Sequence, residues 1–553
     1  MSALNLLVFR AGQRHASGHD LKAALITRLE SLAGYASHDA LLGALLLAGE
    51  LECGVADATD AAQADASHPV ELLTDGLAEG ILQAVTAPSL QSLREVARTS
   101  TVCEQLRISV PEGFAYYALD PLAYAHALDR ILADAGSVLV VGIRSIGATL
   151  SAIAAAAARR HGKEARRITV RPEGHPYNRR TEFSRAQLAV VQQAVSSGAT
   201  LVVVDEGPGL SGSSFLSVAE ALERAGAPGE KIILLGGHEP NVDALCAADA
   251  ARRWRRFRYH AVAGEPRRPT SAVDFIGAGQ WRSRLLNDRS EWPATWTSLE
   301  RLKYLSPAAH DGQQLFKFAG LGHYGDPVFA RERTAAECGF GPPICQESDG
   351  FVSYPWLKGS PLAAGNPSNL SRGILAWLAE YCAFRLREFS VELSDLKPLQ
   401  LMAEHNLNEL KLDLPVMLRL EHPVIADGRM QPHEWLLTKE GRFLKTDSGS
   451  HGDDHFFPGP TDIAWDLAGT MVEWRMNEEQ SVAFLDLYRR ASGDDASRRI
   501  DGFVTAYTAF RCAYSLMAAN AMRATEEQPR LERAADGYRS LLTATTSSSV
   551  VAL

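Results

Sequence analysis

Between residues 137 and 237 the chain alternates regularly between short strand-like runs and longer helix-forming stretches. The runs SVLVVGI, ARRITVRP, TLVVVDE and KIILLGG each have the length of a strand, and stretches with apolar residues three and four positions apart separate them. Strands joined by helices form crossover units, and such units build a parallel sheet that is covered on both faces. The sequence therefore predicts an α/β fold with a parallel sheet in this part of the chain.

The pattern divides the rest of the chain into further regions. Residues 1–110 are mostly helical and carry no motif with recognisable chemistry, and the α/β domain extends over 111–262. Residues 263–305 contain Pro-rich and Trp-rich stretches, and we expect them to form a linker or docking segment. Residues 306–545 begin with strand-like runs and continue with a long helical region, which predicts an α+β domain. Residues 546–553 are expected to form a frayed tail.

Composition excludes several classes of function. The chain has 553 residues, 46% of them hydrophobic, and a formal net charge of -10, which is typical of a multidomain globular protein and argues against binding nucleic acid or anionic lipid through bulk charge. The seven cysteines lack close C-x-x-C pairing, which favours a reducing cytoplasm, and no apolar stretch approaches the roughly 20 residues of a membrane span. We therefore expect a cytoplasmic protein whose partners are small molecules. Homo-oligomerisation is left open.

Two adjacent acids, Asp205 and Glu206, directly follow the apolar run LVVV, and the loop GLSGSS comes soon after them. Ligands of doubly wound sheets bind beyond the carboxyl ends of the strands, so these acids lie at the expected binding edge. Two carboxylates accept hydrogen bonds from a vicinal diol, and a Gly/Ser loop at a helix start offers donors to a phosphate. The pattern predicts a site for a ribose 5-phosphate. The residues expected to hold its phosphate are Ser211, Gly212, Ser213 and Ser214.

This arrangement resembles the type I phosphoribosyltransferase family, in which an apolar strand, two acids and a small-residue loop bind the sugar phosphate. The upstream stretch VVGIRSIGATLSA strengthens the resemblance, because it places Arg144, Ser145 and Gly147 between a strand and a helix, where the family binds diphosphate. The resemblance implies Mg²⁺ and phosphoribosyl diphosphate as ligands. It also implies that Asp205, Glu206 and Arg144 surround the reacting centre.

Two nearby features leave alternatives open. Gly209 occupies a place where many family members carry a further Asp, so the acceptor is handled in a way that the resemblance does not fix. The basic stretch RPEGHPYNRR, residues 171–180, contains turn formers. It is interpreted either as a mobile loop that closes over the diphosphate or as a solvated surface loop.

In the second half of the chain, the run LFKF presents Lys317 on a predicted strand, and a glycine-rich turn and a helix with Glu332 follow. This order resembles the phosphotransferases of the protein-kinase-like fold, in which a strand lysine contacts the nucleotide phosphates and a helical acid holds it. The later run GFVSYPWLKGSPL resembles the hinge strand that holds adenine in the aminoglycoside phosphotransferase family. The resemblance implies an ATP site that includes Lys317 and Glu332.

The catalytic part of this resemblance lies between residues 424 and 469. Family members show H-x-D followed by an Asn, then a strand that ends in a metal-binding Asp, and later a D-L-A helix start. We match Asp427 to the catalytic base, Asp447 to the metal-binding Asp and Asp466 to the structural acid. Ile425 replaces the His, and Glu434 takes the place of the Asn if the loop is longer here. The resemblance implies Mg²⁺ on Asp447 and Glu434.

Three histidines, His433, His451 and His455, lie close to these acids in sequence. A metal site is one interpretation of them. We interpret them instead as polar loop residues.

The two resemblances together favour a bifunctional small-molecule enzyme. It would combine phosphoribosyl transfer, a glycosyltransferase activity, with ATP-dependent phosphorylation of a nucleoside-like or sugar metabolite. The alternative is a sensor or regulator whose enzyme-shaped domains bind nucleotides or sugar phosphates without turnover. The departures at Ile425 and Gly209 favour that alternative.

Overall fold

The structure is a computed structural model of the 553-residue chain. It describes all residues except 1–3, 11, 33–36, 62–67, 84–85, 133–135, 263–266, 310–311, 358, 363–369 and 550–553. The chain forms two compact units. We call residues 12–268 with 320–324 the α/β unit, and residues 1–11, 269–319 and 325–553 the carboxy-terminal unit.

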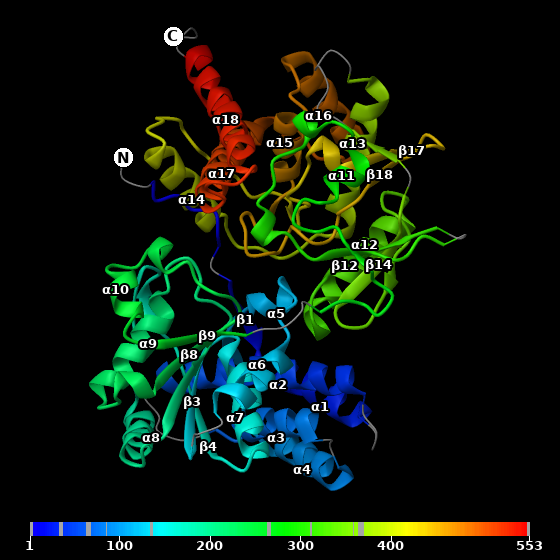
Figure 1. Cartoon of the computed structure of the whole chain (residues 1–553). Helices are drawn as coiled ribbons and strands as arrows, with labels where there is room; N and C mark the ends of the chain where they lie inside the picture. Colours follow the sequence, from blue (N-terminus) through cyan, green and yellow to red (C-terminus); the bar gives the residue numbers. More distant parts are fainter. Residues whose placement is uncertain are drawn as a thin grey trace. The chain divides into compact units, whose positions relative to one another are not determined.

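A five-stranded parallel sheet is the centre of the α/β unit, and several of its strands are labelled in Figure 1. Its strands are β3 (Ser137–Ile143), β4 (Glu164–Val170), β7 (Thr200–Val204), β8 (Ile232–Gly236) and β9 (Arg258–Ala261). Their order is β4-β3-β7-β8-β9, and every neighbouring pair is parallel. The predicted parallel sheet is confirmed. Strand β9 was not predicted, because its sequence RYHA contains no apolar run.

Helices cover both faces of this sheet. They are α6 (Pro121–Ile131), α7 (Gly147–Arg160), α8 (Arg185–Ser196), α9 (Ser213–Arg224) and α10 (Ala250–Trp254). Leu139, Val141 and Phe215 belong to one core that β3, α9 and α10 share. Helix α7 is Ala-rich and buried along most of its length, because strands pack on one side of it and other helices on the other.

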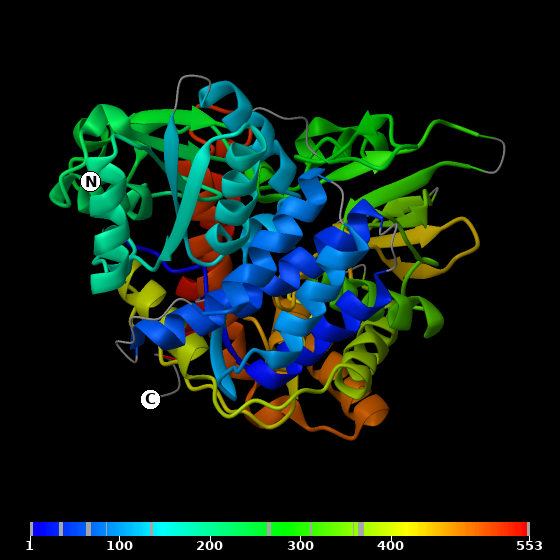
Figure 2. The same cartoon turned by 90° about the horizontal axis from the view of Figure 1, so that it is seen from below.

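Four helices precede the sheet and run close together in Figure 2. They are α1 (Gly18–Ser31), α2 (His38–Ala61), α3 (Val70–Gln83) and α4 (Ala87–Thr99). Strand β1 (Gln13–Ser17) pairs antiparallel with β2 (Gln105–Ser109). The sequence analysis predicted neither strand, because it interpreted residues 1–110 as mostly helical. The smaller elements of the unit are α5 (Glu112–Ala115), β5 (Glu173–His175), β6 (Asn178–Arg180), η1 (Gly229–Lys231), η2 (Val242–Ala244) and η5 (Gly322–Tyr324).

The carboxy-terminal unit contains a five-stranded antiparallel sheet. Its strands are β10 (Asp274–Phe275), β11 (Lys303–Leu305), β12 (Gln314–Phe318), β13 (Cys345–Gln346) and β14 (Phe351–Pro355), in the order β10-β11-β12-β14-β13. Helix α12 (Asp326–Glu337) follows β12 along the chain. Strands β10 and β11 lie within 263–305, where we expected a linker or docking segment, because strands of two and three residues are too short to show a period of two.

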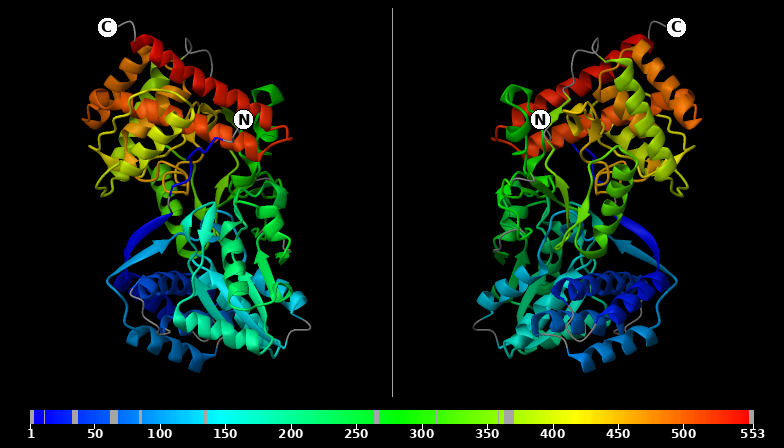
Figure 3. Two further views of the ribbon diagram at one scale, coloured as in Figure 1. Left: turned by 90° about the vertical axis from the view of Figure 1, so that its left-hand side faces the viewer. Right: turned by 90° about the vertical axis from the view of Figure 1, so that its right-hand side faces the viewer.

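Long helices make up most of the rest of this unit. They are α13 (Arg372–Glu388), α14 (Lys397–Glu409), α15 (Ala464–Glu473), α16 (Glu478–Ser492), α17 (Ile500–Ala521) and α18 (Gln528–Ser549). Both views in Figure 3 show α17 and α18 side by side. Helix α18 continues into the stretch that we expected to be a tail. The short elements are α11 (Arg282–Leu285), η3 (Arg289–Glu291), η4 (Thr297–Leu299), β15 (Gly359–Pro361), β16 (Pro423–Val424), η7 (Pro432–Glu434), β17 (Trp435–Thr438), β18 (Phe443–Lys445), β19 (Thr461–Asp462) and η8 (Ala496–Arg498).

The beginning of the chain also belongs to the carboxy-terminal unit. Val8 is buried in the core of that unit. The Leu7 N–H donates to Asn406 Oδ1 at 2.8 Å, and Asn406 Nδ2 donates to the Leu7 carbonyl at 2.7 Å. These residues lie within 1–110, where the sequence predicted a mostly helical region.

None of the helices in the described ranges is long and apolar enough to cross a membrane.

Candidate functional sites

The strand order of the parallel sheet changes direction between β3 and β7, and this switch point is where ligands of such sheets bind. The loop after β3 begins at Arg144 and ends where α7 starts. The loop after β7 begins with Asp205 and ends where α9 starts. The structure therefore brings the two predicted binding loops to neighbouring strand ends.

Asp205 and Glu206 lie at the carboxyl end of β7, and their neighbours hold them in place. The Tyr124 hydroxyl donates to the Asp205 carbonyl at 2.8 Å, and the Gly113 N–H donates to Oε2 of Glu206 at 2.5 Å. Burial and the nearby charge of Glu112 raise the pKa of Asp205 to about 7. The same two causes raise the pKa of Glu206 well above its usual range. The pair can offer a proton or accept one, which suits contact with hydroxyl groups.

The loop predicted to hold a phosphate has its hydroxyls turned toward one carbonyl. Ser211 Oγ and Ser213 Oγ donate to the Pro176 carbonyl at 2.8 and 2.5 Å. Gly212 has a φ of 67°, which a glycine adopts without strain, and it precedes α9 without giving the helix a side-chain cap. Ser214 is half-buried in the first turn. Pro176 lies between β5 and β6, so the basic 171–180 stretch is a short hairpin that contacts this loop.

Arg144, the predicted diphosphate contact, has its guanidinium paired with acids of α2. It is 6% exposed, and its guanidinium forms ion pairs with Asp57 and Asp60 at the end of α2. It also donates to the hydroxyl and carbonyl of Thr169 at 3.0 and 2.9 Å. Because the acids come from a distant part of the chain, no local pattern indicates this pairing. The other loop residues sit as expected, with Ser145 half-buried and Gly147 at the start of α7.

Gly142 and Gly147 approach each other so closely that neither position has room for a side chain. A Cβ atom added to Gly142 at the end of β3 would lie 2.2 Å from the Gly147 carbonyl oxygen. The two backbones therefore pass each other too closely for side chains. This contact fixes the turn that places Ser145 at the switch point.

In the carboxy-terminal unit, Lys317 is on β12, the third strand of its sheet along the chain, and α12 with Glu332 follows. Protein kinases place their phosphate-binding lysine on the third strand and its acid on the next helix. The Lys317 ammonium pairs with Asp447 and donates to Ser450 Oγ at 2.8 Å. Glu332 instead accepts from Ser448 Oγ and the Gly449 N–H, each at 2.9 Å.

The expected pairing of Lys317 with Glu332 is therefore replaced by two other contacts. Within the described ranges no ion pair joins these two residues. Burial raises the pKa of Glu332 although the Lys317 charge opposes the shift. The pKa of Asp447 is held well below its usual range by Lys317 and His451, whose charges outweigh the effect of burial. Lys317 thus carries the counter-charge of Asp447.

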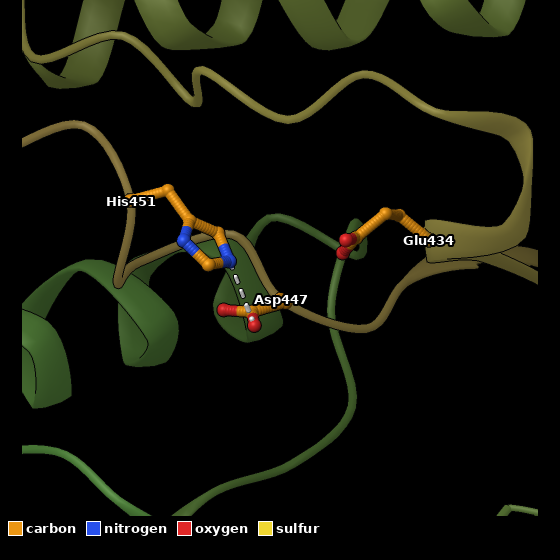
Figure 4. A group of neighbouring side chains, drawn as sticks. All are labelled: Glu434, Asp447 and His451. Carbon is orange, nitrogen blue, oxygen red and sulfur yellow. Dashed lines mark hydrogen bonds and ion pairs between the residues drawn. The ribbon is translucent and has the colours of Figure 1, made fainter. Parts of the chain in front are cut away.

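Three side chains gather around Asp447 as potential metal ligands. One ligand atom each from Glu434, Asp447 and His451 lies within 4.8 Å of the others. Figure 4 shows the His451 ring directed at Asp447, and its Nε2 atom is 3.0 Å from Oδ2. The predicted ligands Asp447 and Glu434 thus lie together. His451, which we interpreted as a polar loop residue, is a third candidate, and its spacing of four from Asp447 was the available signal.

Lys445 is a site residue that the sequence interpretation did not single out. Its fully buried ammonium lies 3.4 Å from Asp427 Oδ1 and 3.3 Å from Glu434 Oε2, and it donates to the Asp447 carbonyl at 2.8 Å. The only signal in the sequence is a lysine within the short strand that leads to Asp447. A fixed positive charge therefore lies among the three acids.

Asp427, the predicted catalytic base, is enclosed in this structure. It is 1% exposed, and its carboxylate accepts from the Tyr381 hydroxyl and faces Lys445. Asp466, the predicted structural acid, accepts from the backbone N–H groups of Asp427 and Gly428 at 2.7 and 2.9 Å. A general base must reach the proton that it removes, so Asp427 would have to be uncovered to act as one.

The spacing offers a different match. The kinase catalytic loop reads H-R-D-x-x-x-x-N. If Glu434 stands at the Asn, then Arg429 stands at the Asp and Asp427 at the His. The loop then has the same length as in the kinase motif. The base assigned to Asp427 remains a prediction, but its burial favours this second match.

The predicted adenine-binding hinge runs through β14 and β15. Strand β14 is bonded between β12 and β13, and beyond it the Trp356 N–H donates to the Gln313 carbonyl at 2.7 Å. Lys358, in the middle of the hinge sequence, lies outside the described residues. The backbone groups of Gly359 and Ser360 pair with β17.

No protein-family model matches this sequence, and no curated protein matches it either. Several solved structures resemble part of the chain. They include a choline/ethanolamine kinase family protein from Mesorhizobium loti, with 16% identity over 44% of this chain and 84% of that chain and a TM-score of 0.32. Macrolide 2'-phosphotransferase MphH from Brachybacterium faecium has 16% identity over 44% and 90%, with a TM-score of 0.29. An aminoglycoside phosphotransferase from Alicyclobacillus acidocaldarius has 13% identity over 53% and 99%, with a TM-score of 0.32. At these scores the likenesses carry no argument about function.

Proposed function

We propose that the carboxy-terminal unit is an ATP-dependent phosphotransferase that acts on a small molecule. The observation that carries this proposal is the meeting of Lys317, Asp447 and Glu434, which come from separate elements. To bind a nucleoside triphosphate with Mg²⁺, a kinase-like site uses a strand lysine for the phosphates and polar side chains such as carboxylates for the metal.

The donor chemistry fits Mg²⁺, since carboxylate oxygens of Asp447 and Glu434 are the ligands that this hard cation prefers. Bound there, Mg²⁺ would neutralise negative charge on the phosphates. Lys317 would leave Asp447 and contact the phosphates. Lys445 would remain in place and keep the acids from repelling one another.

The test is calorimetric titration of Mg·ATP into the full chain and three variants. Asp447→Asn and Lys317→Met remove the two central charges, and Asp486→Asn removes a half-buried acid on α16, paired with arginines of its own helix, as a control. We expect the control to bind like the unaltered protein and the two site variants to lose most binding. ADP release is then followed with pools of sugars and nucleosides as acceptors.

A second candidate function is nucleotide binding without turnover, as in a sensor. The enclosed carboxylate of Asp427 favours it, because no other acid stands at the predicted base position. Binding of Mg·ATP without ADP release from any acceptor pool supports the sensor. Acceptor-dependent ADP release supports the enzyme.

For the α/β unit we propose phosphoribosyl transfer from phosphoribosyl diphosphate, with the acceptor unidentified. The support is the position of Asp205 and Glu206 at the switch point beside the Ser211–Ser214 loop. The double variant Asp205→Asn with Glu206→Gln keeps the shape of both side chains. It should weaken phosphoribosyl diphosphate binding at least about ten-fold, because the amides cannot ionise and so cannot form the charge-assisted contacts that the carboxylates would form with a diol once deprotonated. Asp243→Asn, which removes an exposed acid of the same unit, serves as the control, and equal binding by all three proteins would remove this assignment.

A further inference from the structure

The ring of Tyr514, on α17, lies beside two arginine side chains. The Cζ atom of Arg511 is 5.2 Å from the ring centroid, and the Cζ atom of Arg429 is 5.3 Å from it. Both guanidinium groups are always charged. Two like charges on one ring repel each other, and an anion between them would remove that repulsion.

Arg429 has unused hydrogen-bonding capacity. Its backbone N–H donates to Asp427 Oδ1 at 3.1 Å. In the part of the chain that the structure describes, its guanidinium contacts the Tyr514 ring and makes no hydrogen bond. A guanidinium has five N–H donors in a planar fork that matches an oxyanion. Asp454 and Glu434 interact with the Arg429 charge at a distance, without a hydrogen bond to its guanidinium.

Arg511 is more enclosed and also incompletely satisfied. It is 8% exposed, and its Nε atom lies 3.2 Å from Glu473 Oε1 and from the Tyr538 hydroxyl. Its Nη1 atom is buried without a hydrogen-bond partner, as is Oε1 of Gln431, whose Nε2 atom donates to the same Glu473 oxygen at 3.4 Å. Buried polar atoms normally have partners, so this donor and this acceptor have capacity to bind a ligand.

The place of Arg429 in the loop gives these contacts a function. If Glu434 stands at the Asn of the kinase catalytic loop, residue 429 stands where the Asp receives the proton of the substrate hydroxyl. An arginine there cannot accept a proton. It can bind a phosphate through paired hydrogen bonds. A neutral or cationic acceptor would not form such charge-assisted pairs with the guanidinium.

From this geometry we infer that Arg429 and Arg511 form an anion site for a small molecule that carries a phosphate monoester. Calling that molecule the phosphoryl acceptor rests on the proposed function, whereas the anion site itself does not. Gln431 Oε1 would accept from a hydroxyl of the same ligand.

The test uses the full chain, without nucleotide, and a matched ligand set. Glycerol 2-phosphate, inorganic phosphate, glycerate and glycerol are titrated into the unaltered protein, Arg429→Gln, Arg429→Lys and Arg333→Gln. Arg333 is the control, because it also lies over an aromatic ring of this unit, that of Phe329 at 5.5 Å. Phosphate bound in the α/β unit is common to all four proteins and cancels in the comparison. Thermal unfolding establishes that each variant is folded.

We expect Arg429→Gln to weaken glycerol 2-phosphate binding about ten-fold or more, Arg429→Lys to lose less, and Arg333→Gln to lose nothing. Equal binding by Arg429→Gln and the unaltered protein would overturn the inference, as would a preference for glycerate over both phosphates. Mg·ATP is titrated into the same samples. If Mg·ATP binds and the Arg429 effect is absent, the anion site fails alone; if the effect is present and Mg·ATP does not bind, the phosphotransferase fails alone.

Discussion

The ammonium nitrogen of Lys445 lies 3.3 Å from a carboxylate oxygen of Glu434, and the lysine side chain is fully buried. Asp427 lies at 3.4 Å from the same nitrogen, so one cation serves two acids. Burial of a charge is unfavourable unless it is paired. This lysine therefore supplies the positive charge that Asp427 and Glu434 share.

Replacement of Lys445 should strongly destabilise the carboxy-terminal unit. Lys445→Met leaves Asp427 and Glu434 without their shared partner, and breaking a buried pair in this way costs about 3–5 kcal/mol. Urea unfolding measures the change, with Lys439→Met on the exposed part of the same hairpin as the control. Adding Glu434→Gln to Lys445→Met should recover part of the loss. A change in Lys445→Met no larger than that in Lys439→Met would contradict the pairing.

The stability of the α/β unit should depend on pH through Asp205. Burial raises the pKa of Asp205 from 3.8 to about 7 in the folded protein. Between these values the folded state holds a proton that the unfolded chain has lost, so the free energy of unfolding falls as pH rises from 3.8 to about 7. Asp205→Asn should reduce this dependence by about 1–3 kcal/mol across that range.

Unfolding curves collected at several pH values for the unaltered protein and Asp205→Asn provide this measurement. Asp243→Asn, which removes an exposed acid of the same unit, is the control and should keep the dependence of the unaltered protein. Parallel curves for all three proteins would show that Asp205 titrates normally.

A side chain at residue 142 should disturb the turn at the switch point. In Gly142→Ala the new Cβ would lie 2.2 Å from the Gly147 carbonyl oxygen, which forces the two backbones apart. We expect a loss of about 1–3 kcal/mol in the free energy of unfolding. Gly136→Ala, where nothing lies within 4 Å of the added atom, is the matched control. Denaturant unfolding should separate the two variants clearly.

The parallel sheet was predictable because β3, β7 and β8 are continuous apolar runs, and burial on both faces leaves that signature. The meeting of Asp447 with Glu434 was also anticipated, through the resemblance of residues 424–469 to the phosphotransferase motifs. The pairing of Arg144 with Asp57 was not, because such long-range ion pairs leave no local pattern. Lys445 was missed for a related reason: a lysine on a short strand is usually exposed, and only the acids around it show that this one is not.

Titration of Mg·ATP into the unaltered protein, Asp447→Asn and Lys317→Met tests the central claim most directly. Lys317 pairs with Asp447, and Asp447 lies with Glu434 and His451, so each variant removes a different part of one nucleotide site. The account predicts saturable binding by the unaltered protein, and at least about ten-fold weaker binding by both variants while both remain folded. Equal affinity in all three proteins, or no binding by the unaltered protein, would contradict a phosphotransferase site in the carboxy-terminal unit.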